Sequence, residues 1–125
     1  MRDLLGLALA GALGTVCRYA VSTWTKGWLG ERFPWGTLAV NVLGCLLLGF
    51  VMSAAVSTGI MPRALRLPVT VGFFGAFTTM STFGFETMHF IEANAWGHAL
   101  GNVGANLVLC LVATWLGIFA GRALG

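Results

Sequence analysis

Four long apolar stretches divide this chain, and they constrain its fold more than any other feature of the sequence. They cover residues 4–24, 36–57, 67–91 and 96–122, and each is close to the roughly 20 residues that cross a hydrocarbon core as a helix. Hydrophobic residues make up 58% of the chain and charged residues only 9%, with a mean hydropathy of +0.87. We therefore expect an all-α membrane protein, with a single four-helix transmembrane domain over residues 1–125.

The links between these stretches are short, so neighbouring helices are expected to run antiparallel. The first stretch is longer than the apolar region of roughly 7 to 15 residues in a signal peptide, and no cleavage is expected. Cys17, Cys45 and Cys110 lie inside apolar stretches at spacings typical of neither a zinc site nor a redox pair. They are interpreted as small buried hydrophobic residues.

The basic residues are divided almost evenly between the two ends of the predicted helices. One end holds Arg2, Arg63, Arg66 and Arg122, and the other holds Lys26, Arg32 and, counted generously, Arg18. Lys and Arg residues near the spans set the orientation of a membrane protein. Because the two ends of these helices differ little in basic residues, we expect the chain to insert in both orientations. The natural assembly is then an antiparallel homodimer, although a single orientation remains open. Glycines on the first, second and fourth helices permit close contact, within one subunit or between two.

Residues 72–86 combine an apolar segment with four closely spaced hydroxyls. Gly72 and Gly75 loosen the predicted helix before the hydroxyls begin. The hydroxyls belong to Thr78, Thr79, Ser81 and Thr82. Strained backbone at membrane depth is tolerated where protein buries it or where it lines a watery cavity. The stretch therefore predicts a binding site or a pore lining.

Two other predicted helices carry polar residues at a spacing of four. Thr37 and Asn41 share one face near the start of the second helix. The fourth helix has His98, Asn102, Asn106, Cys110 and Thr114, of which the central part, from Asn102 to Cys110, is expected to face one way. Polar groups inside a membrane indicate function, and this row resembles a track for a polar solute. Polar packing between helices is the alternative.

Charge and aromatic character point to a small anion. Arg18, if it faces inward, supplies positive potential, and Glu86 is its acidic counterpart at depth in the third stretch. Phe83 stands beside hydroxyls, and a ring has a positive edge. Ring edges, hydroxyls and amide N–H groups bind an anion without the full positive charge that would trap it. No catalytic motif is present, so neither an enzyme nor a nucleic-acid partner is expected.

Three motifs occur in order along the chain: GALGTVCRY at 11–19, FPWGTLAVNVLG at 33–44 and GFFGAFTTMSTF at 72–83. Together with the length and the four spans, they resemble the signatures of the Fluc (CrcB) family of fluoride channels. The resemblance implies an antiparallel, dual-topology homodimer in the cell (inner) membrane, with helix three broken near its middle. Its two pores would export fluoride passively and relieve fluoride toxicity, with membrane lipid around them.

The resemblance also assigns residues. It places Asn41, Met80, Phe83, Ser81, Thr82, Thr37, Asn106, Cys110, Thr114 and Asn102 along the fluoride pore, and it matches Arg18 to the family's helix-one arginine. Arg18 and, from its position in the apolar stretch, Glu86 are expected to be vestibule or structural charges. Backbone carbonyls of Gly75 and Thr78, from both subunits, would hold a structural sodium ion at the dimer axis. Met80 is a departure, because the family usually has phenylalanine there and a thioether lacks the positive ring edge.

Two other classes of protein remain as alternatives. A proton-coupled exporter like the small multidrug resistance proteins also has four spans and dual topology. Such an exporter needs a carboxylate in the middle of helix one, whereas Asp3 lies at its end. A membrane assembly subunit that transports nothing leaves the polar rows unexplained.

Overall fold

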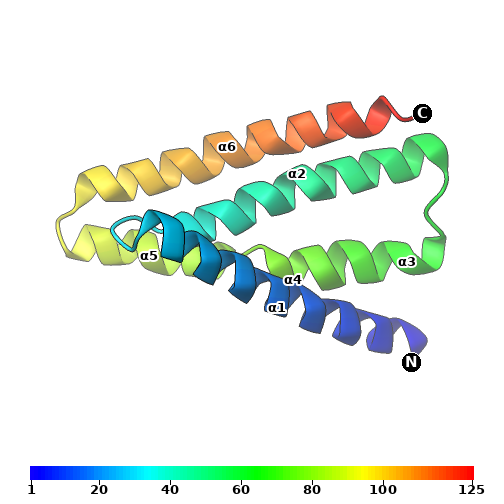
Figure 1. Cartoon of the computed structure of the whole chain (residues 1–125), viewed down its shortest axis with the longest axis horizontal. Coiled ribbons are helices and arrows are strands. Elements are labelled where there is room, and N and C mark those ends of the chain that lie inside the picture. Colours follow the sequence, from blue (N-terminus) through cyan, green and yellow to red (C-terminus); the bar gives the residue numbers. More distant parts are fainter.

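The computed structural model describes residues 1–125, and every regular element in it is a helix (Figure 1). Three long helices and a segmented one follow one another along the chain. In order they are α1 (Arg2–Leu29), α2 (Trp35–Thr58), α3 (Arg63–Leu67), the π-helical segment η1 (Pro68–Phe74), α4 (Gly75–Phe77), α5 (Met80–Glu92) and α6 (Trp96–Arg122). The all-α prediction is therefore confirmed.

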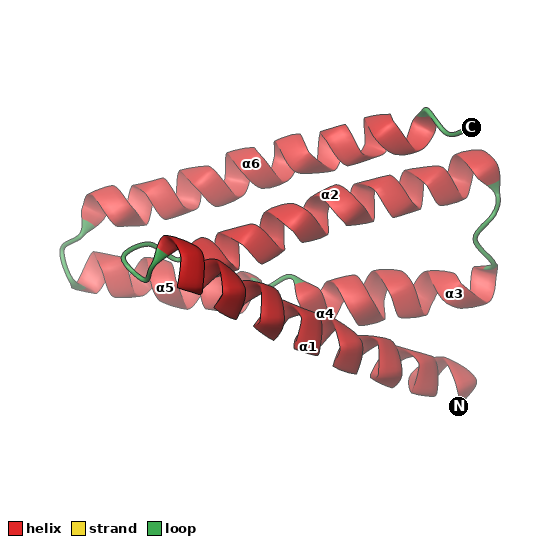
Figure 2. Cartoon of the chain, viewed as in Figure 1, coloured by secondary structure: helices red, strands yellow, loops and turns green.

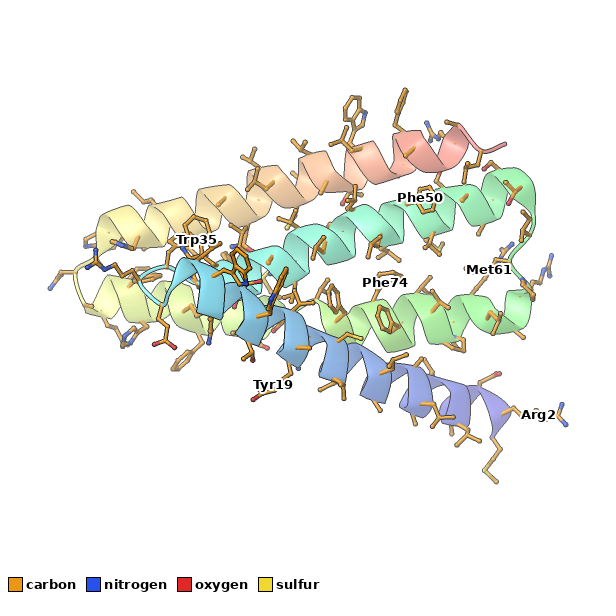
Figure 3. The ribbon with its side chains drawn as sticks, viewed as in Figure 1. Arg2, Tyr19, Trp35, Phe50, Met61 and Phe74 are labelled. Carbon is orange, nitrogen blue, oxygen red and sulfur yellow. The ribbon has the colours of Figure 1, made fainter.

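Successive segments run antiparallel, so that both termini and α3 lie at one end of the molecule (Figure 1). Arg2 and Met61 lie toward this same end (Figure 3). The helices α1, α2 and α6 are each long and apolar enough to cross a membrane. The fourth expected span, residues 67–91, is built from several shorter helices instead of one.

Glycine and proline set the ends of the long helices. Gly30 follows α1 with φ 82°, and Gly59 follows α2 in the left-handed region with φ 67°. Only glycine enters this region without a steric penalty, so it is the usual residue after a helix. Pro34 precedes α2, where its missing N–H leaves no helical bond unmade.

The third segment is interrupted at two consecutive threonines. Thr78 and Thr79 have extended backbone, with ψ of 158° and 111°, between α4 and α5 (Figure 2). The side chain of Thr79 caps α5 by accepting a hydrogen bond from the N–H of Thr82. The backbone of this segment is thus extended for two residues and then becomes helical again.

Close backbone contact joins α2 to α6, the most extensive helix pair in the fold. A methyl group added at Gly49 would lie 2.7 Å from the carbonyl oxygen of Thr114, and one at Gly121 would lie 2.6 Å from that of Phe50. Side chains larger than hydrogen at these sites would push the helices apart. By contrast, Gly97 and Gly104 have open space beside them within this chain.

The single chain buries few side chains fully, among them Val40 and Asn102. Phe74 of η1, 5% exposed, points from the third segment toward α2 (Figure 3). Large apolar side chains cover the outside, including Leu4, Val56 and Phe119, each more than half exposed. An exposed apolar surface of this extent fits a chain surrounded by lipid and by other membrane helices.

Candidate functional site

Five of the ten residues predicted for the pore meet at one cavity, which lies where the helix break faces α2 and α6. Its volume is about 320 Å³. The lining residues are Asn41, Gly44, Cys45, Leu48, Thr78, Thr79, Met80, Phe83, Asn106, Leu107, Cys110 and Leu111. None of them carries a formal charge, so polarity comes from amides, hydroxyls and thiols. Five residues predicted for the pore, from three different elements, therefore share one cavity.

Asn41 connects α2 to the helix break and to α6 at once. Its Oδ1 accepts a hydrogen bond from the N–H of Thr79 at 2.8 Å, and its Nδ2 donates to the carbonyl of Thr79 at 3.2 Å. The same Nδ2 donates to Oδ1 of Asn106 at 3.0 Å. Both amide protons of Asn41 are therefore engaged, and the side chain holds the extended backbone in place.

Side-chain amide hydrogen bonds continue from Asn106 into the interior of the protein. Asn106 Nδ2 donates to the carbonyl and to Oδ1 of Asn102, at 2.9 and 3.0 Å. Asn102 has no exposed surface, and its Nδ2 donates to the hydroxyl of Thr87 at 2.9 Å. Buried amides need such partners, so Asn102 supports Asn106 from behind and does not line the cavity.

A neighbouring cavity of about 630 Å³ extends the site along α2 and α6. It shares Cys45 and Leu48 with the first cavity, and Thr114 belongs to its lining. Its lining also includes Ser53, Ser57 and Arg122, near the ends of the two helices. We call the two cavities together the α2–α6 groove. It leads from the uncharged break to a basic end.

Thr37 and Glu86 form a separate contact between α2 and α5. The hydroxyl of Thr37, which is buried, donates to Oε1 of Glu86 at 2.7 Å. Oε2 of Glu86 is buried and has no hydrogen-bond partner within the chain. A buried carboxyl oxygen without a hydrogen-bond partner is costly, so this oxygen is an unusual feature of the contact.

The other predicted residues lie near the cavity or outside it. Ser81 and Thr82 are exposed at the start of α5 and contact the Thr79 hydroxyl at 3.3 and 2.9 Å. Arg18 is partly buried on α1 and lines neither cavity. Gly75 is exposed at the break, and Thr78 lines the first cavity.

The helix break also redirects two backbone donors. In a continuous helix the N–H of Thr79 would bond to the carbonyl of Gly75, and the N–H of Thr82 to that of Thr78. Here Thr79 donates to Asn41 instead, and Thr82 donates to the Thr79 hydroxyl. The carbonyls of Gly75 and Thr78 thereby lose their helical donors.

Thr79, one of the hydroxyl residues that the sequence singles out, fixes the break from both its backbone and its side chain. Two contributors to this site were not predicted. Thr87 supports Asn102, and Cys45 lines both cavities. Cys45 follows Asn41 by four residues, as Cys110 follows Asn106, and this spacing is a signal present in the sequence. All three cysteines are partly exposed in this chain, so the interpretation of them as buried is wrong.

An all-helical fold with apolar outer faces and an uncharged polar groove at a broken helix defines a multi-pass integral membrane protein. The chain belongs to the CrcB family, because the family model described as "CrcB-like protein, Camphor Resistance (CrcB)" matches residues 5–118. The family resemblance and the localisation to the cell membrane are thereby confirmed.

Similar proteins are named as channels. A "Fluoride-specific ion channel FluC" of Geobacter sulfurreducens is 48% identical, over 99% of this chain and 100% of its own length. A protein of the same name from Citrifermentans bemidjiense is 45% identical, over 99% of this chain and 100% of its own length. A "Fluoride-specific ion channel FluC 2" of Symbiobacterium thermophilum is 46% identical over 91% of this chain and 93% of its own. These names agree with the expectation that the chain is not an enzyme.

Proposed function

We propose that this chain is a fluoride-selective channel that lets fluoride leave the cytoplasm passively and so relieves its toxicity. The observation that carries the proposal is the uncharged cavity in which Asn41, Phe83 and Asn106 meet at the helix break. Relatives that share its full length are named fluoride-specific ion channels. A small anion is attracted by ring edges and N–H groups, and the absence of a cation in the lining leaves it free to move on.

The hydrogen bonds of the cavity suggest how an ion is bound without being trapped. The N–H groups of Asn41 already have acceptors in Thr79 and Asn106. Fluoride would replace one of these oxygens as acceptor, exchanging one hydrogen bond for another. A net bond of this kind contributes about 0.5–1.5 kcal/mol, so the exchange is nearly balanced. Entry and exit are then both fast.

We propose further that the working unit is an antiparallel, dual-topology homodimer of four-helix subunits, with two pores. Met80 in the cavity lining is 73% exposed, so one chain alone does not enclose the cavity. A second copy would close it. Gly97 and Gly104, with open space beside them, permit close approach by another helix. Basic residues at both ends allow insertion in both orientations.

A structural sodium ion at the dimer axis completes the proposal. Carbonyl oxygens of Gly75 and Thr78, deprived of their helical donors, fit a hard cation that prefers oxygen ligands. Two such oxygens from each subunit would hold it, and its charge would tie the two broken helices together. Replacing sodium by potassium on both sides of the membrane is expected to lower fluoride flux and dimer stability. Unchanged flux and stability would count against the site.

Ion flux from liposomes tests the function directly. Purified protein in vesicles loaded with potassium fluoride should release fluoride once an ionophore shunts the voltage, while vesicles loaded with chloride stay at background. Protein-free vesicles are the control. Absent fluoride release, or chloride release at the same rate, would contradict the proposal. Release that requires an opposing proton gradient would favour the exporter instead.

A further inference from the structure

The register of α2 on α6 places two cysteines side by side. These helices run parallel (Figure 1), and side-chain hydrogen bonds join Asn41 to Asn106 and Ser53 to Ile118, each across 65 positions of sequence. Cys45 and Cys110 have the same separation and lie one turn beyond the asparagine pair. The shared register therefore sets Cys45 beside Cys110 at the cavity next to the helix break.

Both thiols are reachable from the groove. Each is partly buried, and neither forms a disulfide bond. Both line the cavity at the helix break. The third cysteine, Cys17, is on α1 and lines neither cavity of the groove. The chain therefore offers one pair of adjacent thiols and one isolated thiol, which serves as an internal control.

The surroundings of the pair restrict the ligand. No group of three or more His, Cys, Asp or Glu residues lies together in the chain. Structural zinc takes four such ligands, and calcium and magnesium take oxygen ligands, so these ions find too few ligands here. Thiolates prefer soft cations, and soft ions with a filled d shell, such as Cu⁺ and Hg²⁺, accept two ligands.

We propose that Cys45 and Cys110 form a two-thiolate binding site for a soft, thiophilic metal cation on the wall of the α2–α6 groove. Each thiol loses its proton, two sulfur–metal bonds form, and two protons are released for every metal bound. No electron is transferred and no oxidant is needed. The bound ion joins α2 to α6 across the groove.

The position of the site gives it a second consequence, which rests on the proposed function. A metal bound between Cys45 and Cys110 occupies the cavity that also holds Asn41 and Phe83. If fluoride passes through this cavity, the metal blocks it. Metal binding itself is independent of whether the chain conducts.

Binding of Hg²⁺ to the reduced, purified protein tests the site. After one equivalent of mercuric chloride and an excess of glutathione as competing monothiol, mass spectrometry of the intact chain should show one mercury in place of two protons. After the glutathione is removed, maleimide labelling of the folded chain in detergent should leave Cys45 and Cys110 unmodified, although both react when no mercury is added. Mercury retained by no chain, or both of these thiols still reactive, would overturn the proposal.

Single variants locate the ligands. Cys45→Ala and Cys110→Ala should each lose the bound mercury in glutathione, because one sulfur competes no better than the monothiol. Cys17→Ala should retain it, with no reactive thiol left. Loss of mercury in Cys17→Ala, or its retention in both of the other variants, would overturn the assignment. If a variant folds poorly, maleimide labelling of the wild-type protein still shows which cysteines hold the mercury.

Measurements of fluoride flux distinguish a failure of the proposed metal site from a failure of the proposed channel function. Mercury should abolish release by wild-type protein and by Cys17→Ala, with recovery after a dithiol chelator is added. Bound mercury with unchanged flux would overturn the placement of the pair on the ion path. Absence of flux before mercury is added would contradict the proposed function, and the mass measurement would still decide the metal site.

Discussion

The side-chain amide of Asn41 binds the backbone of Thr79 twice, accepting from its N–H at 2.8 Å and donating to its carbonyl at 3.2 Å. A backbone that leaves a helix inside a membrane must find other partners for its polar groups. Asn41 supplies both partners from a neighbouring helix. The break in the third segment is therefore a property of two segments together, and it positions Met80 and Phe83 at the cavity.

Replacing Asn41 by aspartate should lower fluoride flux about tenfold or more. The carboxylate cannot donate to Asn106 or to the carbonyl of Thr79, and it brings a negative charge into an anion path. Two lost hydrogen bonds of about 1 kcal/mol each are enough for a change of this size. Flux is measured with a fluoride electrode on proteoliposomes.

The same exchange at Asn94 is the matched control. Asn94 is exposed between α5 and α6 with φ 56°, a conformation that aspartate also tolerates. Asn94→Asp should leave flux and thermal stability unchanged. Equal flux in the Asn41 and Asn94 variants would show that Asn41 plays no part in conduction.

Met80→Phe should raise fluoride flux. Met80 lines the cavity, and a phenyl ring of similar volume adds the positive edge that a thioether lacks. Met88→Phe, on the same helix but outside the cavity lining, is the control and should change nothing. If both variants conduct like the wild type, the side chain at position 80 only fills space.

Gly49→Ala should destabilise the fold by about 1–3 kcal/mol, as expected for overpacking. Its methyl group would lie 2.7 Å from the carbonyl oxygen of Thr114, and a backbone atom cannot move aside alone. Gly27→Ala, at an exposed helical position with open space beside it, should be neutral or slightly stabilising. Thermal unfolding in detergent measures both. Equal stability of the two variants would mean that α2 and α6 separate easily.

Biasing the insertion of the chain should abolish its activity if the dimer is antiparallel. Removing the charges of Arg63 and Arg66 favours one orientation, and removing those of Lys26 and Arg32 favours the other. Each double glutamine variant alone should lose fluoride flux, and co-expression of the two should restore it. Orientation is followed by labelling a cysteine introduced at Gly125 with an impermeant reagent. Full flux from chains shown to share one orientation would refute the antiparallel dimer.

Much of the site could be predicted from spacing. Asn41, Asn106 and Cys110 occur at intervals of four on apolar helices, and such intervals place residues on one face wherever the helix packs. Spacing does not tell how each helix is rotated about its axis relative to its neighbours. Asn102 belongs to the same row as Asn106, yet it turns inward to Thr87, because the row drifts around the helix.

Entry into a membrane, helical structure and most of the helix ends follow from the amino-acid sequence alone. Apolar length and the positions of Gly and Pro decide those properties locally. Packing of the helices is needed to place α2 and α6 parallel in one register, to bond Asn41 to the backbone of Thr79, and to bring Cys45 and Cys110 to one cavity. Such contacts depend on how two helices are rotated and shifted against each other, and no local pattern specifies that relation.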